Sequence, residues 1–218
     1  LTWSAACPVL SDANAYYVPG GGFSGFWYAL GRFHKLRDNF DNSYYCYSSG
    51  CLVTVASLQK MDKDALYASA HDIQRRWLSG EICRYQVVPT FVNALLHTTS
   101  VKSESELVAI LSRLHIITAR REGFFGMKTA IQTPTTIQEL RELLIQTTWI
   151  PFVTGETLWK DGHMDGAFSM LGHPTYANKL AAPHSSTMLL HTLNFYLSRD
   201  KVNEMWNAGR ELHDMAIS

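Results

Sequence analysis

The chain has 218 residues, of which 46% are hydrophobic and 17% are charged, and its 19 basic and 19 acidic side chains give a formal net charge of zero. This composition is typical of a globular protein with a substantial core, so we expect one domain, 1–218, without the basic surface that nucleic acid requires. No apolar run approaches the roughly 18 residues of a membrane-spanning helix, so the sequence leaves open a soluble or a peripheral membrane protein.

The first quarter of the chain predicts two successive strand-to-helix turns. Residues 16–18 form a short strand candidate that ends at a glycine-rich turn, and apolar side chains at helical spacing predict a helix over 24–37. Aromatic residues predict a second strand over 44–47. The apolar run 51–58 is interpreted as a buried helix, although its β-branched residues favour a strand.

The middle of the chain, roughly 62–148, is mostly helical by its apolar periodicity. Strands are expected at 113–118 and 126–129, and a hairpin over 158–164 is expected to turn at Asp161-Gly162. The expected helices are 62–78, 104–114, 136–146 and 201–215. Because strands alternate with helices, the sequence predicts an α/β layered domain.

The cysteines and histidines do not form a recognisable metal or disulfide pattern. Four cysteines are scattered along the chain without a CxxC pair, and the nine histidines include no HExxH motif. We therefore expect neither a disulfide framework nor a metal or other cofactor. Cys46 and Cys51 are interpreted as small buried side chains, with a cysteine nucleophile as the alternative.

A glycine triplet, Gly20-Gly21-Gly22, lies between the first strand and the first helix. Consecutive glycines let backbone N–H groups face a ligand without obstruction, and the helix start adds partial positive charge. Such a turn can hold a phosphate or a tetrahedral oxyanion, while a plain flexible turn is the simpler alternative. No Gly-Lys-Ser/Thr follows, so the turn is not a P-loop.

Ser48 lies where the second strand ends and the next helix begins, within Cys46-Tyr47-Ser48-Ser49-Gly50. This segment is a G-x-S-x-G nucleophile elbow with cysteine in place of the first glycine. The elbow is tight, so the residues two before and two after the serine must be small, a requirement that Gly50 meets fully and Cys46 in part. The alternative is that Ser48 or Ser49 is an ordinary helix N-cap.

A third motif, Asp165-Gly166-Ala167, follows the hairpin expected at 158–164. Asp-Gly pairs usually form turns, but Asp161-Gly162 already fills that role nearby. A carboxylate at a strand end could accept the proton of a serine hydroxyl and serve as general base.

Taken in order, these motifs resemble the patatin-like phospholipase family over most of the chain. The segment 20–26 is similar to the family's glycine-rich oxyanion loop, closest to its adiponutrin branch, and 46–50 is similar to its nucleophile motif. Asp165-Gly166-Ala167 is similar to its Asp-Gly-Gly/Ala motif. By this resemblance the oxyanion-hole amides belong to Gly20, Gly21, Gly22 and Phe23.

The resemblance implies a three-layer α/β/α fold with a mostly parallel sheet, and a single patatin-like hydrolase domain over 1–218. It implies hydrolysis of acyl esters of glycerolipids, with Ser48 as nucleophile and Asp165 as its only side-chain partner. Lipid or acyl-ester substrates, and peripheral contact with a membrane or lipid droplet, follow from that substrate class.

Three alternatives remain open at this point. Cys46 replaces a usual glycine, and the Asn and Pro that commonly follow the aspartate motif are missing, which fits an impaired, lipid-binding member of the family. An α/β-hydrolase triad would add His173, His184 or His191 in the expected chain order. The aromatic side chains could line an acyl pocket or fill the core: Phe23, Phe26, Trp27, Phe124 and Phe125.

Overall fold

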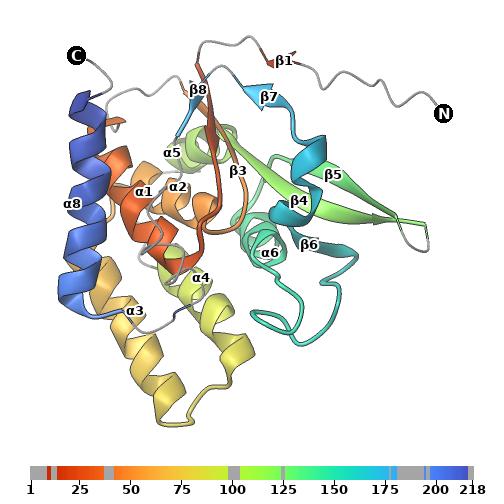
Figure 1. The fold of residues 1–218 in the computed structure, drawn as a ribbon. Coiled ribbons are helices and arrows are strands. Elements are labelled where there is room, and N and C mark those ends of the chain that lie inside the picture. The colour runs from red at the N-terminus through yellow and green to blue at the C-terminus, as the bar shows by residue number, and fades with distance from the viewer. Residues whose placement is uncertain are drawn as a thin grey trace.

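The computed structural model describes residues 9–10, 14–36, 42–97, 104–123, 126–176, 178–180, 194 and 197–215. These residues form an α/β structure with a mixed, mostly parallel central sheet flanked by helices (Figure 1). The α/β class and the mostly parallel sheet expected from the sequence are therefore confirmed.

Six strands make up the central sheet. They are β2 (Ala15–Val18), β3 (Ser43–Cys46), β4 (Leu114–Glu122), β5 (Gly126–Gln132), β6 (His163–Asp165) and β8 (Asn178–Lys179). The order is β5-β4-β3-β2-β8, with β6 paired to β4. The pairs β2–β3, β3–β4 and β2–β8 are parallel, and β5 and β6 run antiparallel to β4. A separate two-stranded pair joins β1 (Val9–Leu10) to β7 (Thr175–Tyr176).

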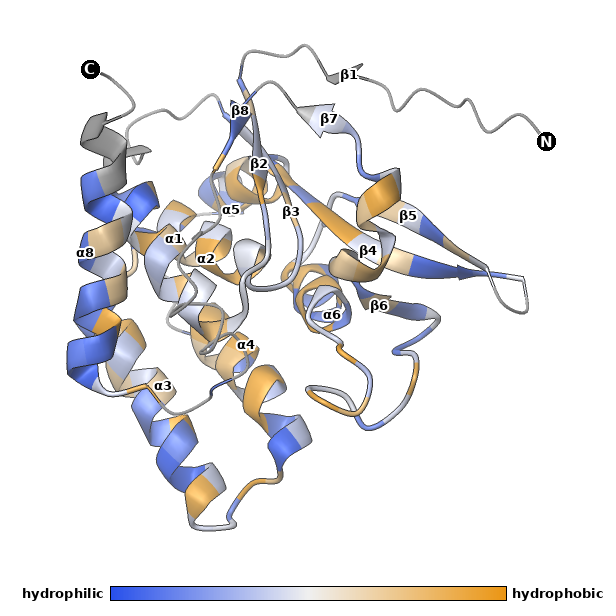
Figure 2. Cartoon of the chain, in the orientation of Figure 1, coloured by the Kyte–Doolittle hydropathy of each residue, from blue (hydrophilic) through white to orange (hydrophobic). Residues whose placement is uncertain are grey.

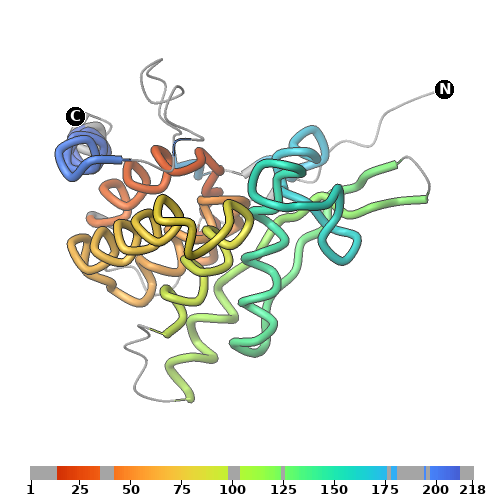
Figure 3. The backbone as a smooth tube through the Cα atoms, turned by 90° about the horizontal axis from the view of Figure 1, so that it is seen from below, coloured from red at the N-terminus to blue at the C-terminus, as the bar shows by residue number. Residues whose placement is uncertain are grey.

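The described helices are α1 (Gly22–Leu36), α2 (Ser49–Leu58), α3 (Lys63–Leu78), α4 (Val87–His97), α5 (Glu104–Leu111), α6 (Ile137–Thr147) and α8 (Arg199–Met215). Two short 3-10 helices are η1 (Arg84–Gln86) and η2 (Gly166–Gly172). Seen from below, β4 and β5 extend away from the helices as a ribbon (Figure 3).

Helix α4 and the short strands β1, β7 and β8 have no range of their own in the sequence prediction. The elements that are expected lie close to where the apolar pattern predicts them, with two differences. The helix expected over 104–114 ends at Leu111, because residues 112 and 113 form a turn that leads into β4 at Leu114. The hairpin expected over 158–164 is only a single bridge, Lys160 to His163, around the expected Asp161-Gly162 turn. Beyond that bridge the chain pairs with β4 as β6.

Helix α2 is helical despite its β-branched residues because it is buried on every side. Residues 49–57 are all buried, and α2 contacts α1, α4, β2 and β3. A helix that is apolar all round belongs in the interior, and Thr54 satisfies its buried hydroxyl by donating to Gly50 O at 2.7 Å. Tertiary burial thus overrides the strand propensity of Val53 and Val55.

Two strands end against the same edge of β4, and this register positions the candidate site. β3 runs parallel to β4 and pairs Cys46 with Ile116. β6 runs antiparallel to β4 and pairs Asp165 with Thr118. Because the two strands approach from opposite directions, their carboxyl ends meet at neighbouring residues of β4.

The last helix packs tightly on the first through two glycines (Figure 1). A Cβ at Gly31 of α1 would collide with the carbonyl oxygen of Trp206, and a Cβ at Gly209 of α8 would collide with that of Tyr28. The outer face of α8 is hydrophilic (Figure 2), whereas Val202 and Met205 on its inner face are 1% exposed. The backbones of the two helices therefore approach as closely as glycine allows.

This packing predicts opposite effects for two Gly→Ala variants of the same helix. Gly31→Ala should lower the free energy of unfolding by about 1–3 kcal/mol, because the added methyl group forces α8 away. Gly25→Ala, where a Cβ meets nothing within 4 Å, should raise it by up to about 1 kcal/mol through helix propensity. Urea denaturation measures both, and equal effects would contradict the close α1–α8 approach.

Candidate active site

Ser48 occupies a sharp turn between β3 and α2, with φ 53° and ψ −138°. Positive φ is uncommon for a residue other than glycine and stores strain of about 1–3 kcal/mol, typical of a nucleophile elbow. Ser48 is the N-cap of α2 by position, yet its side chain makes no capping hydrogen bond. The capping alternative therefore does not account for its hydroxyl.

The small residues of the elbow are sterically required. A Cβ at position 50 would collide with the carbonyls of Val18 and Pro19, and a Cβ at position 20 would lie 2.7 Å from Ser48 Cβ. A Cβ at position 166 would lie 2.6 Å from both Ile117 O and Tyr47 Cβ. Gly50, Gly20 and Gly166 therefore allow β2, β3 and the Asp165 segment to close around Ser48.

Cys46 and Cys51 are buried, as interpreted from the sequence, but they also form a disulfide that the sequence did not predict. Cys46 and Cys51 are joined by a disulfide across the elbow, with their Cα atoms 5.0 Å apart, and both are fully buried. The two cysteines are five positions apart in sequence, and the sharp turn at Ser48 brings the strand end back beside the first turn of α2. Neither residue has a free thiol, so a cysteine nucleophile at either position is excluded in this form, whereas the exposed Cys83 is free.

Thr147, a residue that sequence reasoning missed, holds the backbone of the elbow. The Ser48 N–H donates to Thr147 Oγ1 at 2.9 Å, and the Thr147 hydroxyl donates to Ile117 O of β4 at 2.7 Å. Thr147 is fully buried at the end of α6. No local pattern marks it, because its partners lie 99 and 30 residues away.

Asp165 ends β6 beside Ser48 and is 1% exposed. Its Oδ1 accepts the Ala167 N–H at 2.9 Å, so the carboxylate does cap η2, as its turn alternative anticipated. Within the described part of the chain, its buried Oδ2 has no partner with full hydrogen-bond geometry. The Ser48 hydroxyl nevertheless lies where it can donate a hydrogen bond to the Asp165 carboxyl group. Hydrogen bonds between catalytic groups are commonly long before substrate binds.

Burial raises the pKa of Asp165 from its ordinary 3.8 to about 6, although hydrogen bonds from Ser48 and Ala167 act in the opposite direction. Desolvation dominates because no cation of the described residues acts on the carboxylate. A carboxyl group with a pKa near 6 is ionised at neutral pH and is still basic enough to accept a proton.

The four residues of the glycine turn have different surroundings. The Gly21 N–H donates to Ser49 Oγ at 3.0 Å, which ties the start of α1 to the start of α2. The Gly20 N–H is a hydrogen-bond donor toward the Tyr47 hydroxyl. Gly22 and Phe23, the first residues of α1, line a pocket together with Ser48, and the Gly22 N–H has no partner among the described residues.

Two helix N-termini meet at Ser48. Neither α1 nor α2 has an acidic residue in its first turn, so their partial positive charges are not offset by a nearby carboxylate on the same helix. Negative charge that develops beside Ser48 is therefore stabilised by both helices.

His173 does not form a triad with Ser48. Its Nε2 donates to Gly166 O at 3.0 Å and its Nδ1 accepts from the Tyr17 hydroxyl at 2.8 Å. Burial lowers the pKa of His173, in keeping with a neutral ring that supports the backbone beside Asp165. His184 and His191 lie outside the described residues.

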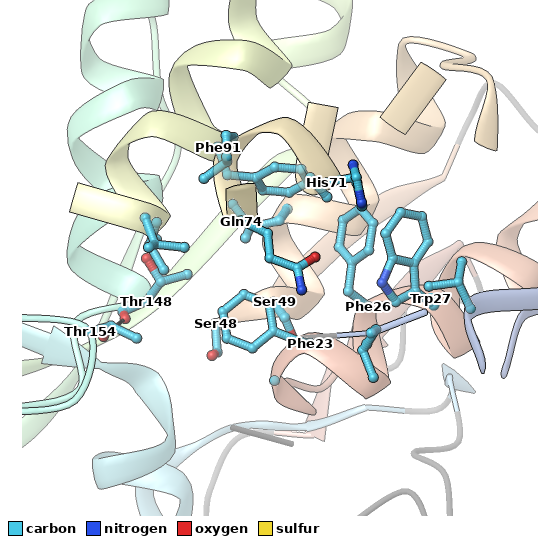
Figure 4. A pocket seen from close by; sticks show the side chains of 18 of the residues that line it. Phe23, Phe26, Trp27, Ser48, Ser49, His71, Gln74, Phe91, Thr148 and Thr154 are labelled. Atoms are coloured by element: carbon cyan, nitrogen blue, oxygen red, sulfur yellow. Dashed lines mark hydrogen bonds between the residues drawn. The ribbon is translucent and has the colours of Figure 1, made fainter. Parts of the chain in front are cut away.

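A mostly apolar pocket opens beside Ser48 (Figure 4). Phe23, Phe26 and Trp27 of α1 line it, so these aromatics both fill the core and face the pocket. Phe124 and Phe125 lie outside the described residues. The remaining walls come from α2, α3, α4, the segment after α6 and the start of α8: Leu52, Tyr67, Ile73, Gln74, Trp77, Val88, Phe91, Thr148, Ile150, Thr154, Leu197 and Val202.

Comparison of the sequence with protein-family models found no matching family, and comparison with curated proteins found no relative. Among the described residues, no helix combines the length and apolar character needed to cross a membrane.

The buried carboxyl predicts a pH-dependent cost to stability. A pKa raised from 3.8 to about 6 corresponds to about 3 kcal/mol of destabilisation once Asp165 is ionised. This cost is absent below pH of about 4 and complete above about 6, so the wild-type free energy of unfolding should fall across that window. Asp165→Asn should be more stable by about 3 kcal/mol at pH of about 8, as measured by urea denaturation. Parallel pH profiles for both proteins would contradict the raised pKa.

The disulfide should stabilise the elbow. Replacing both Cys46 and Cys51 by alanine should lower the free energy of unfolding by about 2 kcal/mol, from the chain entropy of a short loop. Substitution is preferred to chemical reduction because both sulfurs are buried. Cys83→Ala, at an exposed free thiol, is the matched control and should change stability by less than about 0.5 kcal/mol. A double variant as stable as that control would contradict the bond.

Proposed function

We propose that the chain is a serine acyl-hydrolase of patatin-like type that cleaves acyl esters of glycerolipids. The observation that carries this proposal is the strained, uncapped Ser48 beside a buried aspartate, at the wall of an apolar pocket. Strain at a serine φ, a raised carboxyl pKa and a concave apolar site each favour a functional site, and here they coincide.

In the proposed reaction the Ser48 oxygen attacks the ester carbonyl while Asp165 accepts the hydroxyl proton. The tetrahedral intermediate collapses to an acyl-Ser48 ester, and the proton passes from Asp165 to the leaving alcohol. Water then attacks the acyl-enzyme with Asp165 as base, which releases the fatty acid and restores the serine. Asp165 has a suitable pKa, and no histidine with a described side chain is hydrogen bonded to Ser48.

The proposed oxyanion hole is the start of α1. Gly22 and Phe23 line the pocket beside Ser48, and their backbone N–H groups would donate to the oxyanion. Gly21 has a supporting role, because its N–H already holds Ser49. Removing a single donor of this kind costs about 10²–10³-fold in turnover.

The proposed substrate class follows from the pocket and the neighbouring surface. Aromatic and aliphatic side chains around Ser48 suit an acyl chain. Just beyond Asp165, η2 exposes Phe168, Met170 and Leu171, which supports peripheral contact with a membrane or lipid droplet. The central sheet with flanking helices is compatible with the three-layer patatin-like arrangement.

Hydrolysis of a p-nitrophenyl ester and of a phospholipid, with chelator present, tests the mechanism. Ser48→Ala and Asp165→Asn should each lower kcat by at least about 10³-fold, and the double variant should be little worse, because the two residues act as a unit. Wild-type kcat/KM should rise with pH through an apparent pKa of about 6, since the base must be ionised.

Histidine variants separate this dyad from a triad. His173→Gln keeps an amide donor for Gly166 O and should retain activity within about tenfold. His184→Ala and His191→Ala should also retain most activity. Loss of about 10³-fold in any of them would favour the triad, and a wild type inert to both substrates would favour a lipid-binding protein.

A further inference from the structure

The apolar pocket contains a buried polar side chain that has no hydrogen-bond partner among the described residues. Gln74 of α3 lines the pocket and is 7% exposed, and within the described parts of the chain its amide makes no hydrogen bond. Figure 4 shows this amide reaching into the pocket toward Phe23, between Ser48 and Trp27. A donor and an acceptor are thus presented to whatever occupies the pocket.

Three other polar side chains of the pocket, Ser49, Thr148 and Thr154, already have hydrogen-bond partners. Ser49 accepts the Gly21 N–H, Thr148 donates to Leu144 O at 2.7 Å, and Thr154 donates to Thr148 O at 2.6 Å. His71, at the exposed end of the pocket, packs against the Tyr67 ring. Trp27 offers only an indole N–H to the pocket, and Tyr67 and His71 are more exposed than Gln74. Apart from the nucleophile Ser48, Gln74 is therefore the buried pocket side chain that presents both a donor and an acceptor to a ligand.

A plain hydrocarbon chain cannot satisfy the hydrogen-bonding groups of the Gln74 amide. When it displaces water, it leaves both the amide oxygen and the amide N–H groups unsatisfied in a low-dielectric site, and that penalty reduces affinity. A hydroxyl group donates to one end of the amide and accepts from the other, and it carries no charge that would need an ion partner.

We propose that Gln74 selects substrates that carry a hydroxyl group within the apolar pocket. This inference rests on the proposed acyl-ester function and names the substrate feature that the same site recognises. The hydroxyl has two chemical sources, a hydroxylated acyl chain or the free hydroxyl of a partial glyceride. Gln74 is in this sense a specificity-determining residue, distinct from the Ser48–Asp165 pair.

Binding of ligands that cannot be hydrolysed tests the inference independently of turnover. Calorimetry on the wild type compares decanoate with its β-hydroxy and ω-hydroxy derivatives, and decylglycerol ether with its dimethylated form. In at least one pair the hydroxyl-bearing ligand should bind about tenfold more tightly, equivalent to about 1.4 kcal/mol. A preference within the decanoate set identifies a hydroxyacyl chain as the source of the hydroxyl, and a preference within the decylglycerol pair identifies a partial glyceride.

Gln74→Met, which keeps an unbranched side chain without its hydrogen-bonding groups, should abolish that preference, and Gln74→Leu should do the same. Gln59→Met is the matched control, because Gln59 is buried with an unpartnered Oε1 outside the pocket, and it should keep the preference. The inference is overturned if the wild type binds neither set, shows no preference, or keeps its preference without Gln74. Selective binding without ester hydrolysis would instead contradict the catalytic proposal alone.

Discussion

The arrangement of the site depends on two strands of opposite direction that end on the same edge of β4. Cys46 pairs with Ile116 and Asp165 pairs with Thr118. The carboxyl ends of β3 and β6 therefore lie next to each other along β4. If β6 ran parallel to β4, Asp165 would lie at the opposite end of the β4–β6 pairing, away from the end of β3. Once this register is set, the turn after β3 presents Ser48 to the carboxylate, and Thr147 ties the same turn to β4.

This geometry conflicts with stability at two points. Ser48 has a strained backbone, and Asp165 is a buried carboxyl with one well-formed hydrogen bond, to Ala167. The surrounding structure compensates with dense local constraints: glycines that permit close approach, the buried Cys46–Cys51 bond and the fully buried helix α2. Strain held by rigid surroundings is expected where a site must be preorganised for chemistry.

Local rules predicted much of this arrangement, because strand ends, glycine turns and helix periodicity depend on neighbours in sequence. They predicted the β2–α1 and β3–α2 turns and the serine at the second of them. They could not predict the pairing of β6 with β4, the Thr147 hydrogen bonds or the direction of Gln74, which depend on contacts between distant segments. The disulfide was missed because a separation of five residues suits bonding only when a sharp turn reverses the chain.

The most direct test of the Ser48–Asp165 pairing is covalent labelling with a fluorophosphonate, followed by mass spectrometry of the digested chain. We expect a single adduct on the peptide containing Ser48, with a labelling rate that rises as Asp165 ionises around pH of about 6. The Asp165→Asn variant should lose that rate enhancement. An adduct on another residue, or a labelling rate that is the same in wild type and Asp165→Asn at every pH, would contradict the pairing.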